Sequence, residues 1–502
     1  MHKYDFLPLH NGQSVPAGDL PLLSFGTFRH AVIDGVKQGL DLAALFGSDV
    51  EGQIRLTAVL ASHSEGRLYT ASTDVGTAFE SLTPDCAQAQ RFEREIYEQW
   101  SVFPTGHPWL KPVRFQQPLA QTADNQPPLS RAQRESFFSM DGEEVHEVAV
   151  GPVHAGVIEP GHFRFQCHGE AVYHLEIALG YQHRGIEKAL SSGPNLRTRH
   201  YMETLSGDST VGHGTNHALM IESLAQTAPP PRAQAIRGIA LELERLANHL
   251  GDLGALAGDI GFLPTHAYCG RIRGDVLNLT ASLCGNRFGR GLVMPGGVAF
   301  DIDESMRQNL IKRLQTIEAE TRSAVELLWK SPSVLARFEK TGTLSQPDAK
   351  RLGLVGVAAR ACGLAHDVRH DFPLDIYRFA HIPVSVGKEG DVFARAMVRW
   401  LEIQRSFAFV VDQLTALPEG TCFNAPPSLR PRHLAVTLTE GWRGRICHVA
   451  QSNDDGGFQC YKVIDPSFCN WFGLAQAMRN QPISDFPLCN KSFNLSYCGH
   501  DL

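Results

Sequence analysis

The sequence predicts a multidomain α+β protein, in which a small N-terminal α+β domain precedes a larger, mainly α-helical domain with a small sheet. Three observations support this prediction. The 502 residues exceed what one hydrophobic core usually holds. Short β-like and helical runs alternate in the first 115 residues, and long segments with helical period fill most of the remainder. We therefore expect domains at 1–115 and 146–502, joined by a linker at 116–145.

The first domain is predicted from short patterned runs. Ile54–Ala61 and Arg67–Ala71 are rich in β-favouring residues and predict strands, whereas Ala78–Leu82 predicts a helix. The segment 116–145 that follows is polar, contains several prolines and shows no apolar period. A linker or an extended surface arm is therefore expected there.

The second domain begins with strand-like runs at Val148–Val153 and His162–Phe165. In Arg237–Leu256 apolar residues recur every three or four positions, which places them on one face of a helix. Gln308–Lys330 and Val392–Leu417 repeat this pattern. The segment therefore predicts a helical bundle with a small sheet at its start.

Composition and charge exclude several classes of function. The chain has 46 Lys and Arg against 53 Asp and Glu, so nothing suggests a nucleic-acid partner. We expect no transmembrane segment and no export signal, and hence a cytoplasmic location. The 11 cysteines form no C-x-x-C pair, which favours free thiols over disulfides or a zinc module. No nucleotide-binding fingerprint is present, so NAD or ATP would bind another subunit.

Four stretches of the second domain carry a family resemblance. They are GPVHAGVIEPGHFRF from Gly151, GYQHRGIEKAL from Gly180, RACGLAHDVR from Arg360 and ISDFPLCNKSFNLSYCGHDL from Ile483. Together they resemble the large subunit of membrane-bound group 4 nickel-iron hydrogenases, as in formate hydrogenlyase, and the homologous D subunit of complex I (NADH-quinone oxidoreductase). The ERE-x-Y-E and GHP-x-L elements of the first domain are similar to the C subunit of complex I. The resemblance thus implies a fused C-like and D-like chain.

Hydrogenases of this family hold nickel and iron with four thiolates from two C-x-x-C pairs. The resemblance places Ser206 and Ser209 at the first pair, and Ser496 and Gly499 at the second, with Cys498 one position short of the last thiolate. Hydroxyls and a glycine cannot replace the soft sulfur ligands that bridge these metals. We therefore expect no nickel-iron centre and no hydrogen chemistry of the usual kind.

Two interpretations of the vacated site remain open. Ser209, His213 and His217 are spaced four residues apart on a predicted helix and share one face. A zinc or iron site built from His213, His217, Cys498 and His500 is one interpretation. The interpretation that we prefer is a hydrogen-bonded polar cavity without metal.

Complex I lacks the same cysteines, and the family uses that space as the end of a quinone channel lined by a histidine and a tyrosine. The resemblance places the histidine in the loop HAGVIEPGH, where His162 and Glu159 are both candidates. A nearly neutral imidazole can donate to a quinone oxygen and deliver a proton. The tyrosine position is Gly207, so the tyrosine does not carry over, and His213 is the speculative substitute.

Two further residues complete the candidate catalytic set. Glu187 matches a family glutamate near the start of a proton route; the alternative is a salt bridge to Arg184 or another arginine. Arg443 is a candidate for stabilising anionic intermediates; the alternative is an ion pair with a carboxylate such as Asp367. The candidate catalytic residues are thus His162, Glu187 and Arg443, and the candidate quinone-binding residues are His162 and His213.

The resemblance implies a soluble subunit of a membrane-associated complex I-like or hydrogenase-related oxidoreductase. Its partners would be a small iron-sulfur subunit of the complex I B type and membrane antiporter-like and anchor subunits. The chain would bind no cofactor itself and would pass electrons from the partner's Fe–S cluster to quinone, coupled to ion translocation. It would lie on the inner face of the cytoplasmic membrane. The alternative is a catalytically inert scaffold subunit.

Overall fold

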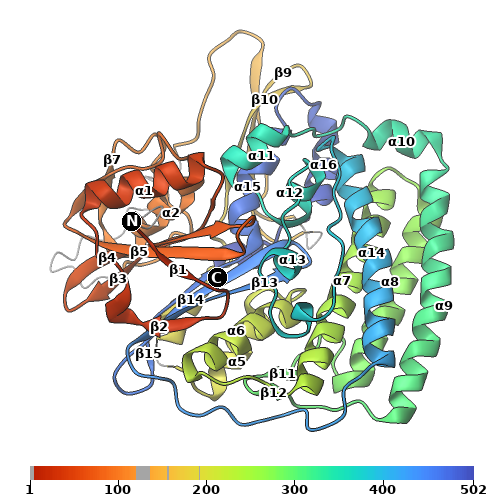
Figure 1. Ribbon diagram of the computed structural model, residues 1–502. Helices are drawn as coiled ribbons and strands as arrows, with labels where there is room; N and C mark the ends of the chain where they lie inside the picture. The colour runs from red at the N-terminus through yellow and green to blue at the C-terminus, as the bar shows by residue number, and fades with distance from the viewer. Residues whose placement is uncertain (1–4, 120–135, 155–157, 192) are drawn as a thin grey trace.

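The computed structural model describes residues 5–119, 136–154, 158–191 and 193–502. An N-terminal α/β unit and a bundle of long helices flank a central region of strands and shorter helices (Figure 1). The C-terminus lies near the middle of the molecule, between these two parts. The arrangement confirms the predicted multidomain α+β class.

The N-terminal unit packs two helices on an antiparallel sheet. The sheet has the strand order β1-β5-β4-β3, with β1 (Leu7–Leu9), β3 (Asp41–Val50), β4 (Gln53–Ser62) and β5 (Arg67–Val75). The helices are α1 (Phe25–Lys37) and α2 (Gln90–Trp100). α1 begins after Ser24, whose Oγ accepts the N–H of Thr27 at 3.3 Å and so caps the helix. Both predicted strands are confirmed.

The helix predicted at Ala78–Leu82 is wrong. Ala78–Glu80 forms strand β6, which pairs in parallel with β7 (Phe103–Thr105). After β6, the backbone N–H of Leu82 donates to the buried carboxylate of Glu93 at 2.6 Å. These contacts across the chain outweigh a weak local helix propensity.

The central sheet joins the two ends of the chain. It has the order β15-β14-β13-β2, with β2 (Ser14–Pro16), β13 (His433–Gly441), β14 (Gly444–Ser452) and β15 (Phe458–Ile464). The register pairs Val15 with Leu434. One hydrophobic cluster combines residues of the N-terminal unit with Val368, Leu434 and Phe468. The boundaries at 115 and 145 stay predictions, but the core of the N-terminal unit is closed by residues from the second domain.

A third sheet precedes the helices, as expected. Its order is β10-β9-β8, with β8 (Val145–Val150), β9 (His162–His168) and β10 (Ala171–Ala178). It packs on α15 (Pro466–Ala477) through a cluster that includes Phe163, Phe165 and Trp471. A short two-stranded sheet pairs β11 (Val293–Met294) with β12 (Gly297–Val298).

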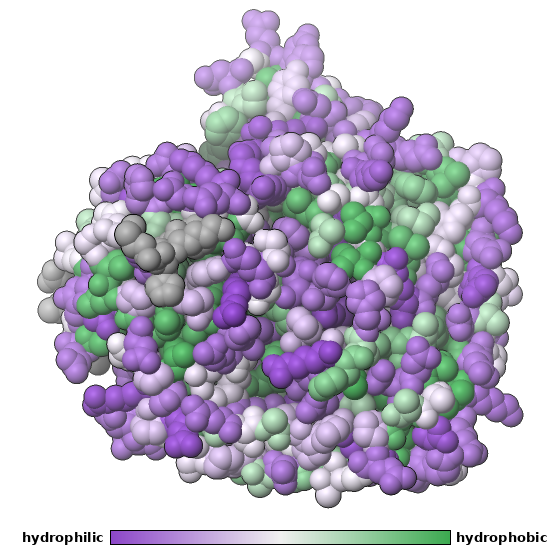
Figure 2. All heavy atoms as spheres, in the orientation of Figure 1, coloured by the Kyte–Doolittle hydropathy of each residue, from purple (hydrophilic) through white to green (hydrophobic). Residues whose placement is uncertain are grey.

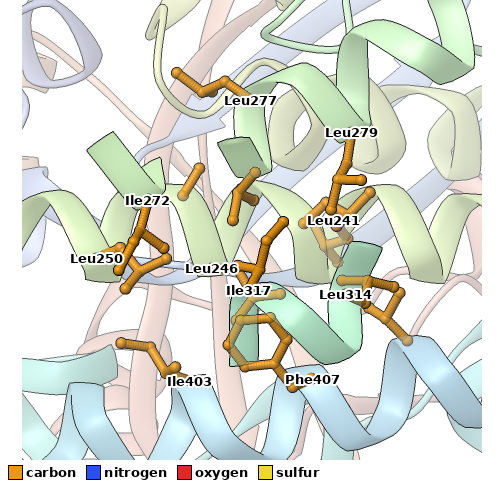
Figure 3. Packing of buried hydrophobic residues seen from close by; sticks show 14 of the residues in the cluster. Leu241, Leu246, Leu250, Ile272, Leu277, Leu279, Leu314, Ile317, Ile403 and Phe407 are labelled. Atoms are coloured by element: carbon orange, nitrogen blue, oxygen red, sulfur yellow. The ribbon is translucent and has the colours of Figure 1, made fainter. Parts of the chain in front are cut away.

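Four long helices form the bundle: α7 (Pro231–Asp259), α8 (Leu263–Cys284), α9 (Glu304–Trp329) and α14 (Val392–Thr415). The predicted periodic segments lie in α7, α9 and α14, so these predictions are confirmed. Leu246, Ile317 and Phe407 come from three different helices and meet in this core (Figure 3). Burial of each such apolar side chain contributes about 1.5–3 kcal/mol to the free energy of unfolding. The apolar face of α7 therefore determines which side of this helix packs into the core.

Shorter helices surround the centre of the molecule. Those nearest the candidate site are α4 (Ile186–Leu190), α5 (Leu196–Leu205), α6 (Thr210–Ala225), α16 (Phe486–Phe493) and α17 (Tyr497–Asp501). The others are α10 (Pro332–Phe338), α11 (Gln346–Leu352), α12 (Gly356–Ala361) and α13 (Val368–Asp371). Four 3₁₀ helices complete the described part of the chain: η1 (Ala17–Asp19), η2 (Ala87–Ala89), η3 (Asp375–Arg378) and η4 (Ile483–Asp485).

Among the described residues, no helix combines the length and the apolar character that a membrane span requires. The face shown in Figure 2 is a mixture of hydrophilic and hydrophobic residues, with hydrophilic side chains prominent along its edges.

Candidate functional site

The structure brings together the four positions assigned to lost thiolates. Ser206 follows α5, Ser209 precedes α6, and Ser496 and Gly499 begin α17. The hydroxyl oxygens of Ser206 and Ser496 are 2.9 Å apart, and Ser496 Oγ also accepts the N–H of Gly499 at 2.9 Å. All four residues are buried. Segments nearly 300 residues apart in sequence thus converge on one polar cluster, which we call the serine cluster.

The serine cluster does not fit a nickel-iron centre. It offers hydroxyls instead of thiolates, and these hydroxyls hydrogen-bond to each other. A Cβ atom added to Gly499 would lie 2.7 Å from the carboxyl group of Asp465 and 2.9 Å from Ser496 Oγ. Asp465 therefore occupies the space into which a fourth ligand side chain would extend.

An ion pair between buried Arg443 and partly exposed Asp208 lies beside the serine cluster. Arg443 Nη1 and Nη2 donate to the two carboxylate oxygens of Asp208 at 2.6 and 2.7 Å, and Ser206 Oγ donates to Asp208 at 3.0 Å. The guanidinium carbon of Arg443 lies 3.9 Å from the centre of the Trp442 ring. Burial alone would raise the pKa of Asp208, but Arg443 outweighs it and the pKa is lowered. The suggested partner Asp367 is wrong, because Asp208 takes this role.

A chain of buried polar side chains leads away from the serine cluster. Asp465 Oδ2 lies 3.0 Å from His213 Nε2, and His213 Nδ1 lies 3.3 Å from His448 Nε2. His448 Nδ1 lies 2.9 Å from the hydroxyl of Tyr461, which lies 3.0 Å from His217 Nδ1. All five residues are buried. We call this chain the His213 relay.

The direction of each hydrogen bond in the His213 relay follows from the charge on His213. An ionised Asp465 only accepts, so His213 Nε2 donates to it. With neutral His213, His448 donates to His213, Tyr461 donates to His448, and His217 donates to Tyr461. When His213 gains a proton, both of its nitrogens donate, and every bond farther along the chain reverses. A proton taken up at one end is therefore transmitted to the other.

The charge states of the other relay groups suit this behaviour. Burial lowers the pKa of His448 well below its ordinary value and lowers that of His217 to about 4. Burial also raises the pKa of Tyr461 well above its ordinary value. These three groups are neutral at pH 7. The pKa of Asp465 is raised by burial but lowered more strongly by His213, so Asp465 is ionised.

The chain is similar to subunits of two kinds of membrane-associated complex. It is 31% identical to the carbon monoxide-induced hydrogenase of Rhodospirillum rubrum over 350 residues, which cover 70% of this chain and 97% of the relative. The chain belongs to the family of hydrogenase large subunits and complex I 49 kDa subunits. Residues 259–433 match the family described as "Respiratory-chain NADH dehydrogenase, 49 Kd subunit".

Two further relatives show both branches of this hydrogenase and complex I family. NADH-quinone oxidoreductase subunit 4 of Thermus thermophilus is 31% identical over 371 residues, covering 68% of this chain and 90% of the relative. Formate hydrogenlyase subunit 5 of Escherichia coli is 27% identical over 488 residues, covering 92% of this chain and 84% of the relative. The resemblance predicted from motifs is confirmed, and relatives of this family are oxidoreductase subunits.

The loop that was expected to supply the quinone-facing histidine is described except for residues 155–157. His162 begins β9, and its Nδ1 lies 3.1 Å from the carbonyl oxygen of Gly151. Its other nitrogen, Nε2, is buried without a hydrogen-bond partner among the described residues. Glu159 Oε2 accepts the N–H of Tyr497 at 3.2 Å. Glu159 therefore contacts Tyr497, the neighbour of Ser496 in the serine cluster. One ring nitrogen of His162 has no hydrogen-bond partner among the described residues.

Glu187 lies in a different part of the centre. Its Oε1 is 2.9 Å from Lys462 Nζ, and its Oε2 accepts from Gln99 Nε2 at 3.0 Å. The suggested pairing with Arg184 is wrong, because Arg184 donates to the carbonyl groups of Thr204 and Leu205 instead. Glu187 also lines a cavity of about 270 Å³.

The structure does not assemble the metal site suggested from His213, His217, Cys498 and His500. His213 and His217 are used in the relay, and His500 Nδ1 lies 2.9 Å from Asp501 Oδ1. Among the described residues, one group of potential metal ligands brings its ligand atoms close enough together to hold a metal ion. This group consists of Asp41, His63 and His366.

The geometry of this second cluster favours an ion-pair cluster over a metal site. The rings of His63 and His366 are stacked at 3.7 Å and nearly parallel, at 9°. A metal ion binds an imidazole nitrogen in the ring plane, so one ion cannot lie in both planes. Arg445 Nη1 also lies 3.3 Å from the Asp41 carboxylate oxygen that faces both histidines.

Sequence reasoning found His213 and His217 but missed Asp465, His448, Tyr461 and Asp208. His448 and Tyr461 lie on adjacent strands β14 and β15, where Ala450 pairs with Tyr461 and His448 with Val463. The only signal was the presence of polar residues in strands that are otherwise apolar.

Proposed function

We propose that this chain delivers electrons and protons to a quinone within a membrane-associated complex. The electrons come from the Fe–S cluster of a small partner subunit of the complex I B type, and quinone reduction is coupled to ion translocation by antiporter-like and anchor subunits in the membrane. The chain lies on the cytoplasmic face, holds no redox cofactor itself and is not a functional hydrogenase. Relatives named as NADH-quinone oxidoreductase and hydrogenase subunits support this assignment.

The observation that carries the proposal is the His213 relay beside the vacated metal positions. Reduction of a quinone to a quinol consumes two electrons and two protons, so the site needs a proton supply. His213 contacts Asp465, which fills the space beside Gly499, and connects it to His448, Tyr461 and His217. A titratable imidazole backed by a hydrogen-bonded chain is suited to this supply.

The other candidate residues have roles consistent with the same reaction. Arg443 keeps a positive charge beside the serine cluster, where it would stabilise an anionic reduced quinone. Because Nδ1 of His162 donates to the carbonyl oxygen of Gly151, the unused Nε2 of a neutral ring would accept from a quinol hydroxyl, and a protonated ring would donate from Nε2 to a quinone oxygen. Glu187, which is bound to Lys462 and lines a cavity, would exchange protons with solvent along the family's proton route.

An inert scaffold is the second candidate function. It is favoured by the direct hydrogen bond between Ser206 and Ser496, which joins two of the former ligand positions without leaving a ligand between them. Such a chain would transmit no electrons and would only hold its partner subunits together.

The purified intact complex tests these alternatives. We expect it to reduce decylubiquinone with at least one of NADH, formate or reduced ferredoxin, and to evolve no hydrogen from reduced methyl viologen. Hydrogen evolution would overturn the proposal. A complex that is fully assembled but inactive with every donor and acceptor would favour the scaffold.

A further inference from the structure

A second cavity lies between the N-terminal unit and the second domain, and none of its lining residues belongs to the serine cluster. Its volume is about 500 Å³. One wall comes from α2 and the loop before it, and the other from the end of α11 and from α15 (Figure 1). A cavity of this size at a boundary between two units is typical of a small-molecule site.

The lining includes four aromatic side chains and one poorly compensated positive charge. Phe92, Trp109, Phe468 and Phe472 form the aromatic walls. Arg91, which lies among them, donates from Nη1 to the carbonyl oxygen of Phe468 at 2.9 Å. Within the described part of the chain, no carboxylate oxygen lies within 4.0 Å of its guanidinium group.

Neighbouring charges do not compensate Arg91. Arg94, one helical turn further on, donates to the carbonyl oxygens of Lys111 and Pro112 at 2.6 and 3.0 Å and lies 4.9 Å from the Trp109 ring centre. The nearby carboxylate of Asp85 is bound by Arg29 at 2.8 Å. Arg91 therefore lines the cavity, and Arg94 lies behind it on the same helix, with carbonyl oxygens as the acceptors of both guanidinium groups.

The surroundings of Arg91 disfavour its positive charge. Burial, together with the positive charge of Arg94, lowers the pKa of Arg91 to about 9. A bound anion would remove this penalty, because a guanidinium group pairs with a carboxylate or phosphate through two parallel hydrogen bonds. Rim residue Arg351 is already paired with Asp348 at 2.8 Å.

We propose that this cavity binds a small organic oxyanion whose head group pairs with Arg91 and whose planar apolar body lies against Trp109 and Phe472. The aromatic rings provide the apolar contact area, and Arg91 provides the specificity for negative charge. This binding site is separate from the serine cluster and does not depend on the proposed quinone chemistry.

Calorimetric titration of the purified complex tests the proposal with three probes of one shape. We expect 2-naphthoate or 2-naphthyl phosphate to bind saturably, and the stronger of the two identifies the head group as a carboxylate or a phosphate. The neutral 2-naphthamide should bind about 10- to 100-fold more weakly, which is the usual contribution of hydrogen bonds to a charged group. Arg91→Gln should weaken anion binding by a similar factor.

Arg351→Gln is the matched control, since it removes an arginine from the rim of the same cavity, and it should change the affinity less than about 3-fold. Equal binding of the neutral and anionic probes, absence of anion binding by the wild type, or an unchanged affinity in a folded Arg91→Gln variant would each overturn the proposal. The comparison between probes uses the wild type only, so it decides the question even if Arg91→Gln does not fold.

Discussion

Replacing His213 with glutamine is expected to lower the quinone-dependent rate of the assembled complex by about 100- to 10,000-fold. Glutamine retains a hydrogen-bond donor and an acceptor toward Asp465 and His448, but its amide cannot take up and release a proton. The relay would then be interrupted at the histidine that contacts Asp465 beside the serine cluster. Steady-state rates with a quinone analogue, measured after assembly has been confirmed, give the result.

Two further variants make this prediction specific. Tyr461→Phe removes only the hydroxyl between His448 and His217 and should also slow turnover, because it breaks the relay without touching the serine cluster. His162→Gln removes the titratable ring from the loop of the second candidate site. Loss of activity only in His162→Gln would assign proton delivery to the loop. Wild-type rates in all three assembled variants would rule out both sites and favour the scaffold.

Replacing Glu402 with glutamine is expected to lower the free energy of unfolding by about 3–5 kcal/mol. Glu402 lies in α14 with 1% of its side chain exposed, and it accepts from Arg360 Nη2 and His249 Nε2, each at 2.8 Å. Burial opposes its ionisation, but Arg360 and His249 outweigh burial and hold its pKa well below the usual range. Without this carboxylate, Arg245 of α7 and Arg360 of α12 each lose one of their buried counter-ions.

Urea unfolding at pH 7, followed by circular dichroism, measures this loss. Glu304→Gln is the control, because Glu304 pairs with Arg307 on the exposed start of α9, and that substitution should leave the unfolding curve unchanged. Because the pKa of Glu402 is depressed, its contribution is present above the ordinary pKa of a glutamate and is lost as the pH falls through the lowered value. A Glu402→Gln curve that coincides with the wild type would show that the network does not stabilise the bundle.

Periodicity was sufficient to predict three of the four long helices, α8 being missed, and the family resemblance was sufficient to predict the vacated metal positions. The apolar repeat in Arg237–Leu256 is a local property of the helix, so it can be recognised without knowing the partner helices. Ser206 and Ser496 were placed together through the family resemblance, and their hydroxyl oxygens indeed lie 2.9 Å apart. Both inferences use features that can be identified in the sequence alone: the apolar period of one helix and the residues that occupy the positions of a family motif.

The remaining features depend on contacts between distant segments. Asp208 and Arg443 are separated by more than 200 residues, and nothing local distinguishes Asp208 from Asp367 as the partner. The relay links a helix to two strands, and its members have no common spacing. Strand β6 likewise forms because Phe103 pairs with Ala78, which a reading of local propensity cannot detect.

On our proposal the serine cluster carries out no hydrogen chemistry and handles protons for another acceptor. Nickel analysis of the purified intact complex is the direct test. Because the four ligand positions are Ser206, Ser209, Ser496 and Gly499, we expect no stoichiometric nickel. One nickel atom per chain, retained through purification, would contradict the account.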